Sequence, residues 1–140
     1  SPVTETTAIA AEFWWLGLMG IVMAVVVLPY VLDRIGTAGF GGALGNPQDI
    51  EAAPSAWAAR MKAAHYNSVE NLAVFAPLTV AVVVAGLGSS MTLLAVQAFV
   101  IARIAYIIIY TLGIPGLRTL AFLVGWVATV FMALVLMGLA

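Results

Sequence analysis

The sequence predicts an all-α integral membrane protein, an up-down bundle of four transmembrane helices. Of its 140 residues, 64% are hydrophobic and only 8% are charged, whereas soluble domains carry about 25% charged residues. Four apolar segments each approach the roughly 20 residues that a helix needs to cross a bilayer. Helices rather than barrel strands are expected, because the apolar runs do not alternate with polar residues.

Each predicted helix begins and ends where the composition changes. The first ends at a pair of charges, and the second is polar before it becomes apolar. The third and fourth are mostly apolar and carry one charged residue each, an arginine. We treat the chain, 1–140, as a single membrane domain. Its spans are approximately 9–32, 56–85, 90–112 and 117–139.

The connections between these spans are unequal in length. A loop rich in glycine, proline and acidic residues is expected over 35–55. The turns at 86–90 and 113–116 are short, so the last three helices should run antiparallel to their neighbours. Short turns of this kind favour up-down topology.

Positive charge predicts the orientation of the bundle. The first loop is flanked by Arg34, Arg60 and Lys62, and Arg118 follows the third. Loops that carry lysine and arginine stay in the cytoplasm. We therefore expect both termini on the non-cytoplasmic side.

Composition also excludes several kinds of chemistry. The chain has no cysteine and one histidine, so we expect no disulfide, no cysteine nucleophile and no bound metal. The net charge of −1 gives no reason to expect a nucleic-acid partner.

Polar residues inside the second and third spans form two stripes. Arg60, Asn67 and Glu70 share one helical face, and Arg103 shares another with Tyr110. A charge at membrane depth costs about 2.5–3.5 kcal/mol and usually has a partner. Glu70 and Arg103 are equally far from the turn between their helices, so we predict an ion pair. The pair either fixes the register of the two helices or belongs to a functional site.

Two stretches carry a family resemblance. The segment "RMKAAHYNSVENLAVFAPL" (60–78) and the segment "ARIAYIIIYTLGIPGLRTLAF" (102–122) resemble the MAPEG family, the membrane-associated proteins of eicosanoid and glutathione metabolism. The preceding loop "GNPQDIEAAP" (45–54) looks like that of bacterial members. The first has the family spacing R-x-x-x-A-x-x-N-x-x-E-x-x-x-x-F. The matching residues are Arg60, Ala64, Asn67, Glu70, Phe75, Arg103, Tyr110 and Arg118.

The resemblance implies a homotrimer in a bacterial inner membrane, with glutathione bound between subunits near the cytoplasmic face. Glutathione would be bound by Arg60, Asn67, Glu70 and Tyr110, and Arg118 would be the catalytic residue that holds its thiol as a thiolate. The activity would be that of a glutathione transferase or peroxidase, on a lipophilic substrate that arrives from the bilayer.

Departures from the family pattern motivate an alternative. Family enzymes carry arginine at the positions of Ala63 and Tyr66, and tyrosine at the position of Phe122. Fewer cations give fewer charge-assisted hydrogen bonds to the two carboxylates of glutathione. A non-catalytic accessory or structural subunit of a larger membrane complex is therefore a second hypothesis. A small transporter or channel is a third, although no inverted repeat is visible.

Overall fold

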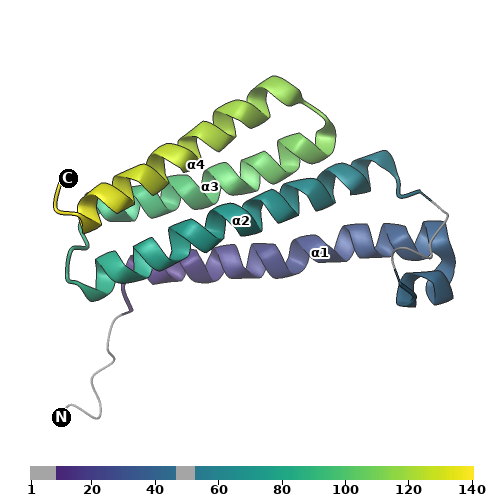
Figure 1. Cartoon of the computed structure of the whole chain (residues 1–140), viewed down its shortest axis with the longest axis horizontal. Helices are drawn as coiled ribbons and strands as arrows, with labels where there is room; N and C mark the ends of the chain where they lie inside the picture. The colour runs from purple at the N-terminus through teal and green to yellow at the C-terminus, as the bar shows by residue number, and fades with distance from the viewer. Residues whose placement is uncertain (1–8, 47–52) are drawn as a thin grey trace, which may run out of the picture.

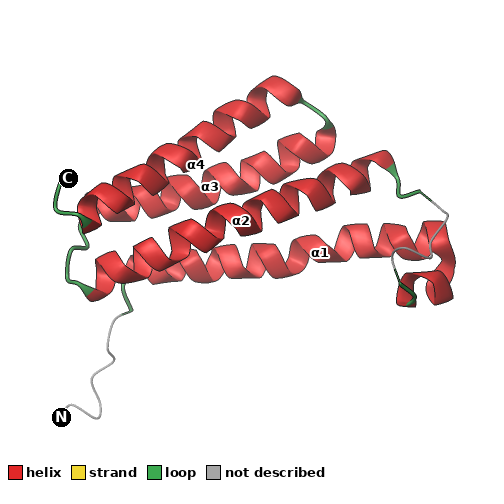
Figure 2. Ribbon diagram, in the orientation of Figure 1, coloured by secondary structure: helices red, strands yellow, loops and turns green. Residues whose placement is uncertain are grey.

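Four antiparallel helices make up the protein in a computed structural model that describes residues 9–46 and 53–140 (Figure 1). The described residues contain no strand (Figure 2). All four helices are long and apolar enough to cross a membrane, so the predicted four-helix membrane class is confirmed. The helices are α1 (Ala11–Leu44), α2 (Ala56–Val84), α3 (Ser90–Leu112) and α4 (Pro115–Leu136).

The helices differ in how many neighbours they have. Each of α2 and α3 packs against the other three helices, whereas α1 and α4 make little contact with each other. The structure thus has a central pair, α2 and α3, with α1 and α4 on its flanks (Figure 1). The most buried helix is α3, while α1 buries only Glu12 and Met19.

The two ends of the bundle differ in character. One end, at the right of Figure 1, holds the end of α1, the start of α2 and the α3–α4 turn. We call it the charged end, because it carries Arg34, Arg60, Lys62 and Arg118. We call the other the apolar end; it holds the start of α1, the α2–α3 turn and the end of α4.

The first helix is longer than the sequence predicted. We expected it to end near residue 32 and a loop to fill 35–55, but α1 continues to Leu44. Asp33 and Arg34 lie within the helix, so these charges do not end it. The helical geometry breaks at Gly39, whose φ of 77° and ψ of 164° suit glycine alone. The short piece beyond it turns away from the axis (Figure 1); residues 47–52 of the predicted loop lie outside the described residues.

A hydrophobic core fills the apolar half of the bundle. At its centre Phe75 of α2 and Phe99 of α3 stack face to face, with ring centroids 3.8 Å apart and planes 3° apart. Both are fully buried. Side chains from all four helices complete this core: Met19, Val82, Ala95, Val96, Val100, Ala128, Met132 and Val135.

Glycines with positive φ make both tight turns. Gly86 has φ 73° and Gly113 has φ 78°. After each glycine a backbone N–H returns to the last turn of the helix, from Leu87 to the carbonyl of Val82 at 2.9 Å and from Ile114 to that of Ile109 at 3.1 Å. This is the usual glycine-capped helix end. Each turn reverses the chain within a few residues, so α2 and α3, and then α3 and α4, run antiparallel.

Candidate polar site between α2, α3 and α4

Arg103 is the centre of the polar interior. Its side chain is only 1% exposed. The terminal Nη2 donates to Oδ1 of Asn67 at 2.6 Å and to Oγ of Ser68 at 2.9 Å. Hydrogen bonds from a charged donor are stronger than neutral ones. The guanidinium therefore ties α3 to α2 midway along the bundle.

The acceptors of Arg103 are themselves fixed by α2. Ser68 donates its hydroxyl proton to the carbonyl of Ala64 at 2.8 Å, which leaves its lone pairs for Arg103. Asn71 donates Nδ2 to Oδ1 of Asn67 at 3.2 Å and to the Asn67 carbonyl at 2.8 Å. Oδ1 of Asn67 thus accepts two hydrogen bonds. One turn of α2 holds the amide in the orientation that Arg103 needs.

A glycine brings α4 close to the same guanidinium. A Cβ atom on Gly125 would lie 3.5 Å from Cδ of Arg103 and 3.7 Å from the ring of Phe99. These are ordinary contact distances, so Arg103 and Phe99 pack directly against Gly125. Phe122, one turn earlier on α4, has its ring 6.0 Å from Cζ of Arg103.

Aromatic rings continue this cluster toward the charged end. Cζ of Arg103 lies 4.1 Å from the ring centroid of Tyr106, and the rings of Tyr106 and Tyr110 meet edge to face at 5.6 Å. Cζ of Arg118 lies 4.3 Å from the centroid of Tyr110. Both guanidinium–ring distances are typical of cation–π contacts. We call these four residues the Arg–Tyr ladder.

The structure does not bring Glu70 to Arg103, unlike the predicted ion pair. Glu70 is exposed on α2, and Arg103 bonds to Asn67 and Ser68 instead. The depth along the helix was predicted correctly, but the face only in part. Asn67, which shares the predicted stripe with Glu70, does meet Arg103. The second acceptor, Ser68, is two positions before Glu70, a rotation of roughly 200° about an α-helix. The contact is therefore centred between Asn67 and Ser68, and Glu70 lies outside it.

Ser68 is a site residue that the sequence analysis missed. It is fully buried, as are Ala64 and Phe75 on the same face of α2. The signal was present in the apolar spacing of that face, where the small and aromatic residues at 64 and 75 mark the buried stripe. A serine on such a stripe needs a hydrogen-bond partner, and Arg103 is the partner.

Arg60 of α2, a predicted glutathione ligand, reaches the end of α3 with its side chain. Its Nε donates to the carbonyl of Thr111 at 3.0 Å. A Cβ atom on Gly113 would lie 3.4 Å from Cζ and Nε of Arg60. The guanidinium therefore covers the last turn of α3, where carbonyl groups lack helical partners.

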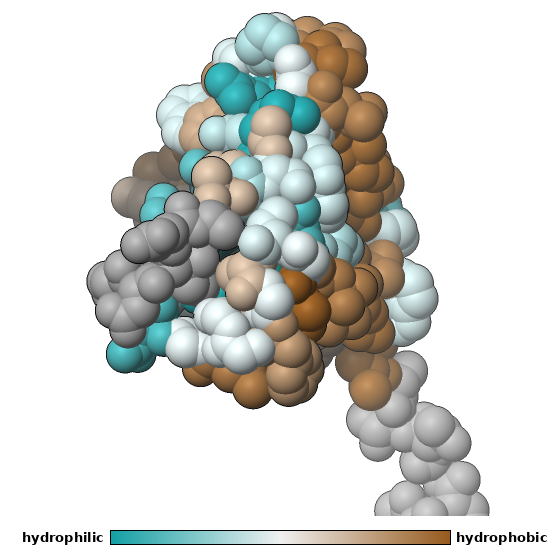
Figure 3. Space-filling view, turned by 90° about the vertical axis from the view of Figure 1, so that its right-hand side faces the viewer, coloured by the Kyte–Doolittle hydropathy of each residue, from teal (hydrophilic) through white to brown (hydrophobic). Residues whose placement is uncertain are grey.

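Two further contacts tie α1 to α2 at the charged end. Asp33 accepts hydrogen bonds from the backbone N–H of Ser55 at 3.0 Å and from the Ser55 hydroxyl. Tyr30 and Nδ1 of His65 are hydrogen-bonded at 2.8 Å. Figure 3 views the bundle from this end, with hydrophilic residues across the middle and apolar residues on the flanks.

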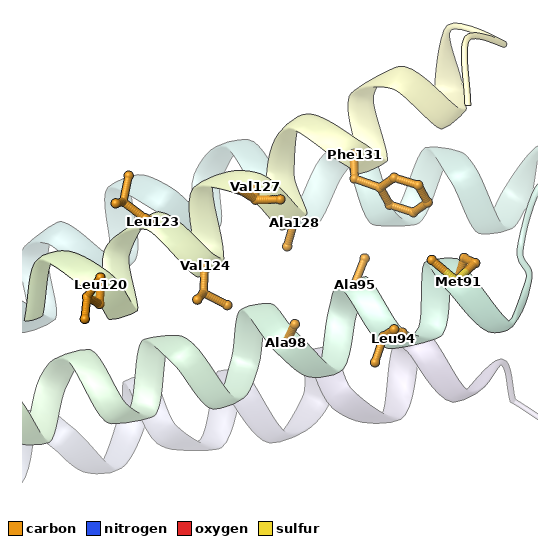
Figure 4. Close-up of a pocket in the computed structure, with 10 residues that line it drawn as sticks. All are labelled: Met91, Leu94, Ala95, Ala98, Leu120, Leu123, Val124, Val127, Ala128 and Phe131. Carbon is orange, nitrogen blue, oxygen red and sulfur yellow. The ribbon is translucent and has the colours of Figure 1, made fainter. Parts of the chain in front are cut away.

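A separate apolar hollow of about 520 Å³ lies between α3 and α4. Figure 4 shows Val124 and Ala128 of α4 opposite Ala95 and Ala98 of α3. None of the predicted site residues lines it, and its lining side chains are all apolar. The hollow therefore belongs to the apolar surface of the helices and not to the polar cluster.

The described part of the chain holds no group of three or more His, Cys, Asp or Glu side chains able to bind a metal ion. The donors of the polar cluster are instead guanidinium, amide and hydroxyl groups, and two phenol rings lie beside the guanidinium groups. The guanidinium groups are positively charged hydrogen-bond donors and can hold an anion.

The fold and this cluster define a multi-pass, four-helix membrane protein with a polar, arginine-centred interior. The model of the MAPEG family matches residues 10–138, a range that takes in all four helices. The chain belongs to the MAPEG family, as its two motifs indicated. No curated protein and no solved structure matches it.

Proposed function

We propose that the protein is a glutathione-dependent transferase or peroxidase that acts on a lipophilic substrate from the bilayer. The observation that carries this proposal is the pairing of Arg118 with Tyr110 at the outer end of the Arg–Tyr ladder. A guanidinium that stacks on a ring is engaged through its flat face, and its N–H groups at the edge can still hold an anion. Family membership supplies the link to glutathione.

Each residue of the site has a chemical part in this proposal. Asn67 and Glu70 bind polar groups of the glutathione backbone, and Tyr110 lies beside the thiol. Arg118 holds the sulfur as a thiolate, which is the nucleophilic form. In the transferase reaction the thiolate sulfur forms a bond to an electrophilic carbon of the substrate. The leaving group departs with its electron pair, and the thiol proton goes to water.

The exposed Glu70 supports a homotrimer with sites between subunits. Glu70 lies midway along α2, a helix that is long and apolar enough to span the bilayer. A lone carboxylate facing lipid at that depth is costly. A second copy of the chain against this face of α2 would remove it from lipid.

The orientation follows from the positive charges, because loops that carry lysine and arginine stay in the cytoplasm. The charged end then lies in the cytoplasm of a bacterium, with both termini outside.

A second candidate is an accessory subunit of a larger membrane complex. The observation in its favour is the small part of α1 that is buried: only Glu12 and Met19 in a helix of 34 residues. Ala63 and Tyr66, which replace family arginines, are also exposed. Under this candidate the purified protein carries other membrane proteins in fixed ratio and binds no glutathione.

The test is turnover by the purified protein in mild detergent, with glutathione and either an aryl halide or a lipid hydroperoxide. We expect one of the two substrates to be consumed, with loss of activity of at least tenfold in Arg118→Ala, the scale typical of a removed transition-state contact. Lys62→Ala is the matched control, because Lys62 is an exposed cation of the same end. Equal activity in Arg118→Ala and Lys62→Ala contradicts the assignment.

A further inference from the structure

Arg60 has a place in the structure that differs from the role its motif implied. Its Nε is bonded to the carbonyl of Thr111, 51 residues further along the chain. Its guanidinium carbon lies against Gly113, at the distance where a Cβ would be in close contact. The side chain is thus held between the first turns of α2 and the last turn of α3.

This contact lies next to both outer members of the Arg–Tyr ladder. Tyr110 immediately precedes Thr111, and the turn that starts at Gly113 leads within five residues to Arg118. The turn is short, so a shift of the α3 end moves both groups of the cation–π pair. A cation beside the carbonyl end of a helix is also favourable electrostatically.

We propose that Arg60 is a positioning residue: it fixes the α3–α4 turn and thereby the placement of Arg118 against Tyr110. This inference rests on the proposed function for its catalytic consequence, but its structural part does not. Arg60 then acts on the thiolate through Arg118 and does not contact glutathione. That separates it from the direct role that the family spacing implies.

The first test compares affinity with turnover. Arg60→Ala should lower kcat about tenfold or more, because displacement of a reacting group by an ångström is that costly. The KM for glutathione should stay within about twofold, because no direct contact is lost. Arg60→Lys keeps a cation and a donor and should recover part of the rate. A large rise in KM with unchanged kcat would show instead that Arg60 binds glutathione.

The second test disturbs the contact between Arg60 and Gly113 without removing a charge. Gly113→Ala adds a Cβ at 3.4 Å from Arg60 on a residue with φ 78°, where alanine is strained. It should reproduce the kinetic pattern of Arg60→Ala. The double variant should be no worse than the poorer single one, because both act on one contact. Additive losses would overturn the inference.

The third test is independent of glutathione. Hydrogen exchange of the backbone amides of Gly113 and Ile114, which are bonded to the last turn of α3, should be at least several-fold faster in Arg60→Ala than in the natural chain. Lys62→Ala, which removes a cation two residues away whose Nζ lies over the Tyr66 ring, should leave these amides unchanged. Unchanged exchange in Arg60→Ala and Arg60→Lys overturns the positioning role. If the natural chain neither binds nor turns over glutathione, the proposed function fails. The exchange rates still decide whether Arg60 fixes the α3–α4 turn.

Discussion

The two halves of this bundle are held together in different ways. Toward the apolar end, the helices meet through apolar side chains centred on the stacked Phe75 and Phe99. From Arg103 to the charged end, a smaller apolar cluster is joined by polar contacts between helices. The buried members of that cluster are Ala64, Tyr106, Ile107 and Ala121. The polar contacts are those of Arg103 with Asn67, Arg60 with Thr111, and Asp33 with Ser55.

This difference separates stability from chemistry. Apolar packing depends on shape and volume, and many sequences can supply it. A buried polar contact needs one partner at one distance, and it costs free energy when the partner is absent. The residues proposed to act on glutathione therefore all lie in the half that holds the polar contacts. Removing contacts from each half should give different kinds of loss.

The largest effect on stability should come from the phenylalanine stack. Phe99→Ala should lower the free energy of unfolding by about 3 kcal/mol, the low end of values for soluble cores, because in lipid the loss is mainly one of packing. Unfolding in mixed detergent measures it. Ile101→Ala, at a side chain 57% exposed, is the control and should change little. Equal effects of the two variants would mean that the stack does not support the fold.

A smaller loss should follow removal of the central guanidinium. Arg103→Ala leaves Oδ1 of Asn67 and Oγ of Ser68 without their donor, at a cost of about 2 kcal/mol. Arg118→Ala should cost no more than about 1 kcal/mol, because it ends a single cation–π contact. The same unfolding assay compares them. A chain with Arg103→Ala that is as stable as the natural one would show that the hydrogen bonds of Arg103 contribute nothing to the fold.

The smallest effect tests how tightly α4 approaches Arg103. Gly125→Ala should be nearly neutral, because its Cβ would meet Cδ of Arg103 at an ordinary 3.5 Å. Gly125→Val adds methyl groups to a filled site and should cost about 1–2 kcal/mol. If both substitutions were neutral, α4 would have room to move away from the polar cluster.

The sequence predicts the class of fold well, because apolar length alone identifies a membrane span. It fails at the end of α1, where charges at Asp33 and Arg34 mark a change of surroundings rather than the end of the helix. Helical geometry continues until Gly39, whose backbone angles the sequence does not specify.

The site was predicted less completely than the fold. Equal distance from a turn gives depth, so Arg103 was correctly expected to meet α2. Which face of α2 it meets depends on how the two helices are rotated about their axes. Arg103 bonds to Asn67 of the predicted stripe, but its second partner is Ser68 and not Glu70. The contact of Arg60 with Thr111 joins residues far apart in the chain. It depends on the tilt of α2 against α3, which no spacing reveals.

If Arg118 acts as proposed, the outer end of the Arg–Tyr ladder ionises a bound thiol. The most direct measurement is the ultraviolet absorbance of the thiolate when glutathione is added to the purified protein at neutral pH. We predict a saturable thiolate signal in the natural chain that is lost in Arg118→Ala and kept in Lys62→Ala. A signal that survives in Arg118→Ala, or no signal in the natural chain at millimolar glutathione, would contradict this role of Arg118.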